Sequence, residues 1–180
     1  MNTNKEKEIL QKLRTNSSHD EAFTLLVTHY KESLYFHIRR ICISHQDSED
    51  ALQETLLRAY RHLGKFKQDS NIYTWLYRIA TNEALRIIEK RNRRKTEDID
   101  KMYNLEQGNI WREDADKINI LMEQAVAKLP TKQKIVFSLR YYNELSYKEI
   151  EKITDTSQSA LKVSYHLAEK KLKNIYHRFY

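Results

Sequence analysis

Four carboxylates gather in eight consecutive residues, 47–54, where metal binding or acid–base catalysis would first be expected. The segment reads Asp-Ser-Glu-Asp-Ala-Leu-Gln-Glu, and apolar Leu56 and Leu57 follow it. Either chemistry needs partners elsewhere, yet residues 5–94 hold no second acidic cluster of comparable density and no glycine-rich loop. Acidic side chains in a first helical turn also stabilise the helix dipole. We therefore expect a helix with an acidic start, with no catalytic residue and no metal site.

A second segment, residues 66–82, interleaves aromatic, amide and basic side chains around an expected loop. Aromatic faces stack on bases that have left a duplex, and amides read base edges, so this mixture suits unpaired DNA. The basic run at residues 90–95 would then meet phosphates. The alternative is that the aromatic residues belong to a core. For Trp75 we favour that alternative, because Leu76 and Ile79 are its helical neighbours.

The clearest helical period lies near the C-terminus, where apolar residues recur at spacings of 4, 3, 4 and 3. They are Leu161, Tyr165, Ala168, Leu172 and Ile175. The opposite face holds small polar and basic side chains, which can reach base edges and phosphates in a major groove. The alternative is an ordinary amphipathic helix with a solvated face. A lone His166 on that face is no signal for a metal.

Residues 145–172 carry the local signals of a helix-turn-helix. Ser146 followed by Glu149 is a capping box, so a short helix should start at Tyr147. A tight turn follows at Asp155, a residue type that tolerates positive φ better than most. The short capped helix, the short turn and the basic second helix together predict sequence-dependent DNA binding.

The rest of the chain indicates an all-α protein of two small helical domains. Apolar residues recur at helical spacing over 25–41, 51–63 and 76–88, and no alternating strand pattern competes. We expect a bundle over residues 5–94 with one short and three longer helices, a flexible acidic linker over 95–117, and a second domain over 118–180.

Composition agrees with a helical protein that meets a polyanion. The 180 residues include 2 Gly and 1 Pro and carry a net charge of +7. Basic blocks flank an acidic stretch, although two solvated domains with an acidic spacer would show the same pattern. Cys42, the single cysteine, should be a buried thiol. No apolar run approaches a membrane span and the polar N-terminus is no signal peptide, so we expect a cytoplasmic protein without membrane insertion.

Taken in order, these motifs resemble a known family. An Asp-x-Glu-Asp-x-x-Gln-Glu helix is followed by Thr-Trp-Leu-x-Arg-Ile-Ala-x-Asn, a Leu-Pro-x-x-Gln helix and a helix-turn-helix. This order resembles the extracytoplasmic-function sigma factors of bacterial RNA polymerase, a branch of the sigma-70 family. The resemblance runs from about Ala22 to Leu172 and is broken only by the linker.

The resemblance implies a role for each motif. The acidic helix would dock on the clamp helices of the polymerase β′ subunit through Asp47, Glu49, Asp50, Gln53 and Glu54. The loop and helix after it would open the −10 element and hold a flipped base through Lys65, Phe66, Lys67, Ser70, Asn71, Tyr73, Arg78, Asn82 and Arg86. The C-terminal helix would read the −35 element through Gln158, Ser159, Lys162, Val163, His166 and Lys170.

The resemblance also implies partners and leaves one rival function open. The partners would be core RNA polymerase, including its β flap, promoter DNA and an anti-sigma factor; no cofactor is expected. The rival is a stand-alone dimeric helix-turn-helix regulator, which would bind its promoter tightly without polymerase. Arg86, Ser164 and Leu167 depart from the common family pattern, so no promoter sequence can be carried over.

Overall fold

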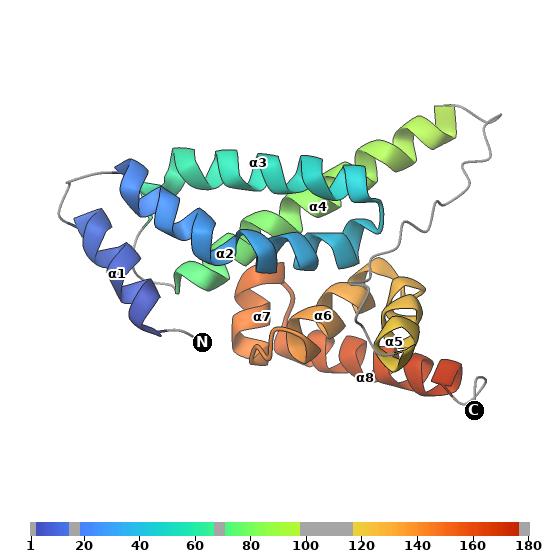
Figure 1. Ribbon diagram of the computed structural model, residues 1–180. Coiled ribbons are helices and arrows are strands. Elements are labelled where there is room, and N and C mark those ends of the chain that lie inside the picture. The colour runs from blue at the N-terminus through green and yellow to red at the C-terminus, as the bar shows by residue number, and fades with distance from the viewer. Residues whose placement is uncertain (1–2, 15–18, 67–70, 98–116, 177–180) are drawn as a thin grey trace.

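The computed structural model describes residues 3–14, 19–66, 71–97 and 117–176, and all regular structure in these ranges is helical. Four helices form an N-terminal bundle: α1 (Thr3–Arg14), α2 (His19–Cys42), α3 (His45–Leu63) and α4 (Ile72–Glu97). Four more form a C-terminal unit: α5 (Lys117–Ala127), α6 (Thr131–Tyr141), α7 (Tyr147–Thr154) and α8 (Gln158–Tyr176). Figure 1 shows the two groups as an upper and a lower layer. The expected short helix and three longer ones are all present in the bundle.

The apolar stripe of α2 forms the centre of the bundle. Leu26, Tyr30, Leu34, Ile38 and Ile41 are each at most 6% exposed, and α3 and α4 pack against the same helix. Burying such side chains is the main source of stability in a bundle of this size. Cys42, at the end of the stripe, is fully buried as expected, and burial raises the pKa of its thiol to about 12.

Helix α1 closes one end of the bundle against α2. Its Ile9 is 1% exposed, and its Glu6 carboxylate accepts a hydrogen bond from the Ile72 backbone N–H at 3.2 Å. That N–H belongs to the first turn of α4, where a helix has unpaired donors and favours negative charge. A contact across 66 residues therefore helps to satisfy the unpaired donors at the start of α4.

In the C-terminal unit, α7 and α8 form the expected helix-turn-helix. Ser146 and Glu149 make a complete capping box, and α7 starts at Tyr147 as predicted. Asp155 ends α7 in the left-handed region at φ 51°. The apolar stripe of α8 faces α5 and α6, with Leu161 and Ala168 fully buried.

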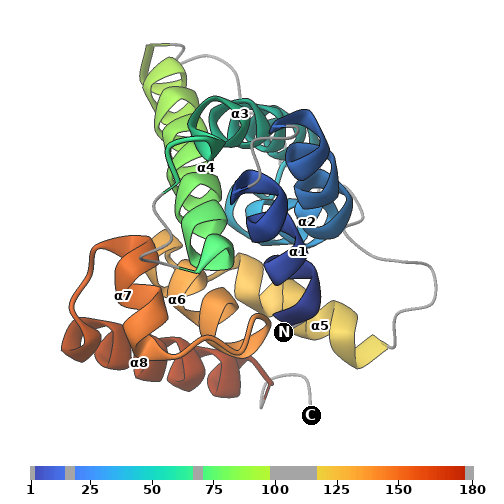
Figure 2. The same cartoon turned by 90° about the vertical axis from the view of Figure 1, so that its left-hand side faces the viewer.

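The two groups of helices are docked on each other. Helix α4 packs on α7, and α2 packs on α6 and α5 (Figure 2). One hydrophobic core runs through the contact, so that Leu34 and Ile38 of the bundle share it with Val136 and Leu139 of α6. Nothing in the periodicity of the sequence indicated this docking.

Candidate nucleic-acid interface

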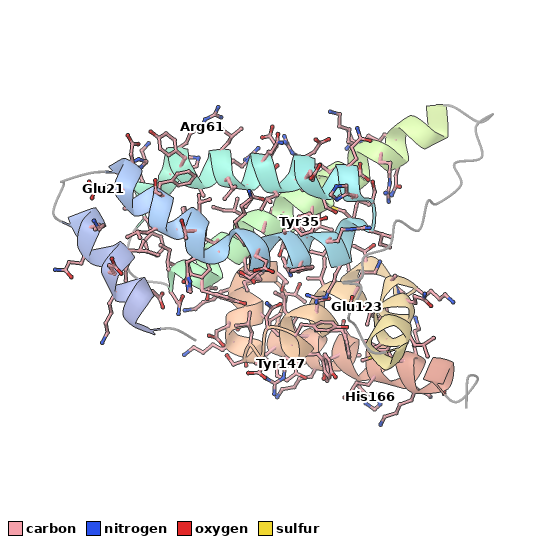
Figure 3. The ribbon with its side chains drawn as sticks, viewed as in Figure 1. Glu21, Tyr35, Arg61, Glu123, Tyr147 and His166 are labelled. Atoms are coloured by element: carbon pink, nitrogen blue, oxygen red, sulfur yellow. The ribbon has the colours of Figure 1, made fainter. Side chains whose placement is uncertain are left out.

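The outer face of α8 carries the side chains expected to read DNA. All six, Gln158, Ser159, Lys162, Val163, His166 and Lys170, are exposed. His166 points away from the rest of the molecule (Figure 3). The departures Ser164 and Leu167 differ from each other, because Ser164 is half-buried and Leu167 is 42% exposed.

Helix α7 and its turn hold this face in place. The Ser146 hydroxyl accepts from the Glu149 backbone N–H at 3.3 Å, and the Glu149 carboxylate accepts from the Ser146 backbone N–H at 2.8 Å. The Gln158 side-chain amide donates to the Glu151 carboxylate at 2.7 Å and ties the start of α8 to α7. Ile150 and Ile153 anchor α7 in the core. The outer face therefore rests on local hydrogen bonds and two buried side chains.

The segment that leads into α4 is only partly described. Lys67 and Ser70, expected at the −10 element, lie outside the described residues. Lys65 and Asn71 are exposed, and the Asn71 side-chain oxygen accepts from the Tyr73 backbone N–H at 2.7 Å. Phe66 is half-buried and packs on Trp75, with ring centroids 5.1 Å apart. The expected core role of Trp75 agrees with that contact.

Tyr73 has a packing role in this arrangement. Its ring stacks on Tyr77 with centroids 4.1 Å apart and meets Tyr30 edge-on at 6.1 Å. Burial, with the nearby Tyr77 as a second cause, raises the pKa of its hydroxyl. Tyr73 would therefore have to leave this stack before it could contact a base.

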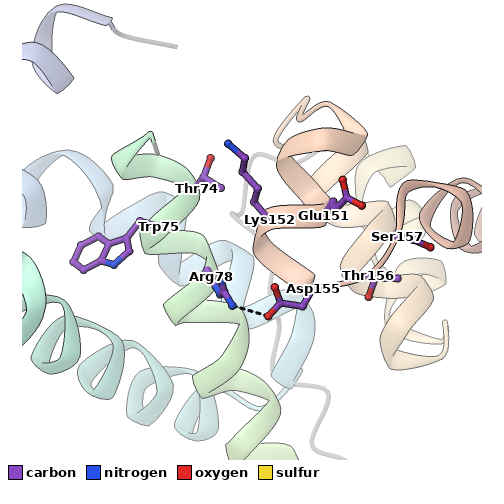
Figure 4. Close-up of a pocket in the computed structure, with 8 residues that line it drawn as sticks. All are labelled: Thr74, Trp75, Arg78, Glu151, Lys152, Asp155, Thr156 and Ser157. Atoms are coloured by element: carbon purple, nitrogen blue, oxygen red, sulfur yellow. Dashed lines mark hydrogen bonds and ion pairs between the residues drawn. The ribbon is translucent and has the colours of Figure 1, made fainter. Parts of the chain in front are cut away.

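Arg78 faces the helix-turn-helix. Its guanidinium donates to the Asp155 carboxylate at 2.6 Å, across the boundary between the bundle and the C-terminal unit (Figure 4). A cleft of about 610 Å³ lies at this point, lined from α4 by Thr74, Trp75 and Arg78, and from the other side by Glu151, Lys152, Asp155, Thr156 and Ser157. Further along α4, Asn82 is exposed.

The structure places a buried carboxylate, Glu83, between expected DNA and polymerase contacts. Glu83 is 3% exposed, lies 2.7 Å from the Arg58 guanidinium and 3.0 Å from that of Arg86. Arg86 also lies 3.6 Å from the Glu54 carboxylate. Sequence reasoning missed Glu83. The sequence does show that Glu83 and Arg86 are three residues apart, a spacing that allows an ion pair on a helix. The contact of Glu83 with Arg58 depends on how α3 packs against α4.

The acidic start of α3 divides into two parts. Asp47 is half-buried and lies 2.8 Å from the Arg91 guanidinium, which also donates to the Cys42 carbonyl at 3.4 Å. Arg91 was expected to meet phosphate with the rest of its basic run, but it is a structural side chain that joins α4 to α3. Asp50 and Gln53 are exposed beside Glu49, which lies 3.3 Å from a His45 ring nitrogen.

Neither a metal centre nor a bilayer span is found in the described parts of the chain. Among the described residues, no three His, Cys, Asp or Glu side chains converge as a metal would require. None of the helices described here combines the length and apolar character that a bilayer crossing needs.

Two family models match separate stretches of the chain. Residues 26–94 match the model described as Sigma-70 region 2. Residues 120–172 match the model described as Sigma-70, region 4. The first stretch covers α3 and most of α2 and α4, and the second covers α6, α7 and most of α5 and α8.

Curated relatives match across both stretches. The ECF RNA polymerase sigma-E factor of Salmonella typhimurium is 33% identical over an alignment of 153 residues, which covers 79% of this chain and 80% of the relative. The RNA polymerase sigma-H factor of Pseudomonas aeruginosa is 32% identical over an alignment of 151 residues, which covers 76% of this chain and 77% of the relative.

Two solved structures share the fold. One is the sigma factor RpoE in complex with the anti-sigma factor NepR from Bartonella quintana, with a TM-score of 0.76, 19% identity, and coverage of 86% of this chain and 96% of that one. The other is CnrH in complex with the cytosolic domain of CnrY, with a TM-score of 0.69, 21% identity, and coverage of 96% and 97%.

Proposed function

This chain belongs to the extracytoplasmic-function branch of the sigma-70 family of RNA polymerase sigma factors, and on that premise we propose how its residues divide promoter recognition. The chain binds core polymerase, reads the −35 element with its C-terminal unit and opens the −10 element with its bundle. The observation that carries this assignment is the exposed polar face of α8, held by a capped α7 and backed by the buried side chains of Leu161, Ala168 and Leu172.

For polymerase docking we propose the exposed acidic part of α3. Glu49, Asp50, Gln53 and the partly exposed Glu54 offer side chains to the β′ clamp helices. Asp47 contributes mainly by orienting α3 through Arg91. A rim of exposed charges sets partner choice and association rate more than raw affinity.

For the −10 element we propose the segment from Lys65 through Arg86. Its exposed cation Lys65 neutralises phosphates, as does Arg78 once it leaves Asp155, while Asn71 and Asn82 offer amides to unpaired bases. Phe66 is only half-buried and can stack on a base. Lys67 and Ser70 belong to the same proposal, as do Tyr73 once it leaves its stack and Arg86 once it leaves Glu83 and Glu54. Capturing unstacked bases offsets the few kcal/mol that unstacking costs.

For the −35 element we propose direct reading by α8. Ser159 and His166 reach base edges, and Lys162 and Lys170 meet phosphates. Gln158 positions the helix start through Glu151 and faces the groove with it. The C-terminal unit would also touch the β flap.

The same proposal includes the domain limits and the cellular setting. We assign residues 5–94 to the −10 and polymerase domain, 95–117 to a linker and 118–180 to the −35 domain. The factor acts in the cytoplasm, where RNA polymerase works, uses no cofactor, catalyses no reaction itself and is restrained by an anti-sigma factor. The family matches do not favour the rival reading as a dimeric regulator.

Transcription from a selected promoter tests the whole assignment. Core polymerase reconstituted with this chain should retain specific promoters from a random library and start transcripts on them. The Lys162→Ala variant should weaken binding on every promoter and lower the slope of log affinity against log salt by about 1. A chain that binds DNA specifically alone, yet directs core polymerase to no promoter, would contradict the assignment.

A charge reversal on α3 tests polymerase docking. Asp50→Lys should slow and weaken assembly with core polymerase, most strongly at low salt, because it places a cation in the acidic docking surface. Arg61→Ala, at an exposed position on the same helix outside the acidic segment, is the matched control and should assemble normally (Figure 3). Equal assembly of both variants would place the docking surface elsewhere.

A further inference from the structure

Two apolar side chains stand exposed within the basic outer face of α8. Val163 is 61% exposed and Leu167 is 42% exposed, and they lie one helical turn apart. Of the exposed large hydrophobic residues on the described surface, Val163 is the most accessible. Isolated exposed apolar residues are common on protein surfaces, so exposure alone does not indicate a binding role and the position of this pair must be considered.

Val163 lies among the polar and basic side chains of the outer face, on the side of that face next to Leu167. With 3.6 residues per turn, Ser159, Val163, His166 and Lys170 fall within a sector of about 60°. Leu167 lies about 40° further round the same helix. An apolar protein groove placed here would have to bury Lys162, Lys170 and the polar end of His166. The DNA major groove accepts them, because its phosphates pair with the lysines.

The major groove has one apolar group to offer, the C5-methyl of thymine. Resting on the proposed function, we propose that Val163, with Leu167 beside it, contacts thymine methyl groups in the −35 element and makes this factor select thymine there. Two residues on this helix depart from the common family pattern. Exposed Leu167 contributes to base selection, whereas half-buried Ser164 does not.

Replacing thymine by deoxyuridine removes only the methyl group and therefore tests the contact directly. Promoters selected by the reconstituted holoenzyme are resynthesised with one −35 thymine at a time as deoxyuridine. At a contacted position the wild-type holoenzyme should bind about threefold to fourfold more weakly, the value of one buried methyl group. Val163→Ala should bind the thymine and deoxyuridine promoters equally, and Val163→Ile should keep the preference.

The controls separate this inference from the proposed function. Lys162→Ala should weaken binding to both promoters and leave their ratio unchanged. A holoenzyme that selects a −35 element but tolerates deoxyuridine at each of its thymines, or selects an element without thymine, overturns the inference alone. A holoenzyme that shows no −35-dependent binding overturns the proposed function.

A different observation concerns the docking of the C-terminal unit on the bundle. Arg40 of α2 lies 3.0 Å from the Glu123 carboxylate of α5, with the two side chains only 17% and 14% exposed. The Arg40 guanidinium also lies 3.8 Å from the centre of the Tyr142 ring, which follows α6. Figure 3 shows Glu123 on α5 where that helix meets α2. Removing one partner of a shielded ion pair is costly, because it leaves a buried charge unpaired, and the contact with the ring adds to the attraction.

Two further polar contacts cross the same boundary. Besides the Arg78–Asp155 pair, the Asn143 side-chain amide donates to the Tyr77 hydroxyl at 3.1 Å. One buried group opposes the contact. Lys134 of α6 is 4% exposed, and burial, with the positive charge of Arg91 as the next cause, lowers its pKa to about 8. Specific polar pairs therefore hold the docked arrangement, and the buried charge of Lys134 weakens it.

The docked arrangement cannot read both promoter elements at once. By their names the elements lie about 25 base pairs apart, or about 85 Å at 3.4 Å per base pair. A compact chain of this length has a radius of gyration of about 16 Å and spans about 40 Å. In addition, Arg78 pairs with Asp155 and would have to leave that pair to contact DNA.

Also resting on the proposed function, we propose that the docked arrangement is an autoinhibited resting state, held by the contact of Arg40 with Glu123 and Tyr142. Core polymerase must separate the two units before the factor works. The acidic surface of α3 stays exposed in the docked arrangement, so inhibition lies in the opening step. The complex that spans both elements forms only from the open fraction, and the apparent affinity of the free chain is lowered by that fraction.

Charge swaps test the contact without touching residues assigned to DNA or polymerase. Arg40→Glu should raise the radius of gyration of the full chain in X-ray scattering, and should raise its affinity for core polymerase at least tenfold. Glu123→Arg should do the same. The double swap Arg40→Glu with Glu123→Arg should return both quantities toward wild type, and unchanged helical content by circular dichroism shows that the variants fold.

Each contrary result has a distinct meaning. Single variants that stay compact would show that this contact does not hold the docked arrangement. Single variants that expand without gaining affinity would show that docking does not inhibit. Either result overturns the autoinhibition and leaves the proposed function intact, whereas a wild-type chain that never binds core polymerase overturns the proposed function.

Discussion

His37 is an ionisable side chain held neutral inside the bundle. Its Nε2 lies 2.9 Å from the Thr81 hydroxyl, whose proton goes to the Tyr77 carbonyl at 2.7 Å. The Thr81 oxygen therefore accepts, Nε2 carries the ring proton, and Nδ1 is buried without a partner. Burial, followed by the charge of nearby Arg40, lowers the pKa of His37 to about 3.

This histidine should make the bundle acid-sensitive. Below pH 6.5 the unfolded chain takes up a proton on His37, whereas the folded chain does not do so until the pH approaches 3. The free energy of unfolding therefore falls as the pH drops from 6.5 toward 3. Between pH 7 and pH 5 the loss should be about 2 kcal/mol of unfolding free energy. Urea unfolding at the two pH values should show this loss in the wild type and in the exposed control His62→Gln, but not in His37→Gln. An identical loss in all three proteins would remove His37 as its cause.

Cys42 should be inert in the native protein. Burial raises the pKa of its thiol to about 12, so almost no thiolate, the reactive form, exists at neutral pH. Iodoacetamide at pH 7.5 should label the chain only after denaturant is added, as mass spectrometry would show. Rapid labelling of the native chain would mean that the end of α2 opens.

At the scale of elements, the short helix α7 depends on its cap. Eight residues are too few for a helix to be stable by itself, so the capping box and the buried isoleucines must hold it. Because only three residues separate the end of α7 from the start of α8, the direction of α7 also constrains the direction of α8.

Removing the cap should therefore lower both stability and promoter affinity. Ser146→Ala deletes the acceptor for the Glu149 N–H and should cost about 1 kcal/mol of unfolding free energy. Lys148→Ala, an exposed change in the same helix, is the control and should stay within about 0.5 kcal/mol of wild type. Chemical denaturation measures the unfolding free energy of both variants. Equal values would mean that the C-terminal unit is stabilised independently of this cap.

At the scale of the whole molecule, Lys134 limits how tightly the two units dock. Its lowered pKa means that docking gains strength as the pH rises from about 8 toward 10.5, the range in which the buried ammonium loses its proton. Below pH 8 the charged form must be buried beside Arg91.

Replacing this cation with an apolar side chain should close the molecule further. Lys134→Met keeps the length of the side chain and removes the charge, so it should stabilise docking by up to about 3 kcal/mol at pH 7. If docking inhibits, the variant should bind core polymerase more weakly than wild type, while Lys132→Met, an exposed change in α6, should not. Stronger binding by Lys134→Met would contradict the assignment of the docked state as inhibitory.

Much of this protein follows from local pattern. The stripe from Leu26 to Ile41, the cap at Ser146, the turn at Asp155 and the buried face of α8 were all predicted, because spacing and capping depend on residues within one or two turns. Exposure of the expected −35 residues followed from the same period. The pairing of Glu83 and the packing of Tyr73 did not follow from local pattern, because they depend on how α4 lies against α3 and α2.

The sequence alone determined the all-α class, the helix-turn-helix and the family, because helical period, capping and the order of motifs are properties of the chain itself. Only the tertiary structure decided that the two units are docked, that Arg40 meets Glu123 across 83 residues and that Arg78 faces Asp155. Such contacts depend on how one rigid unit lies on another, and no local period in the sequence records that placement.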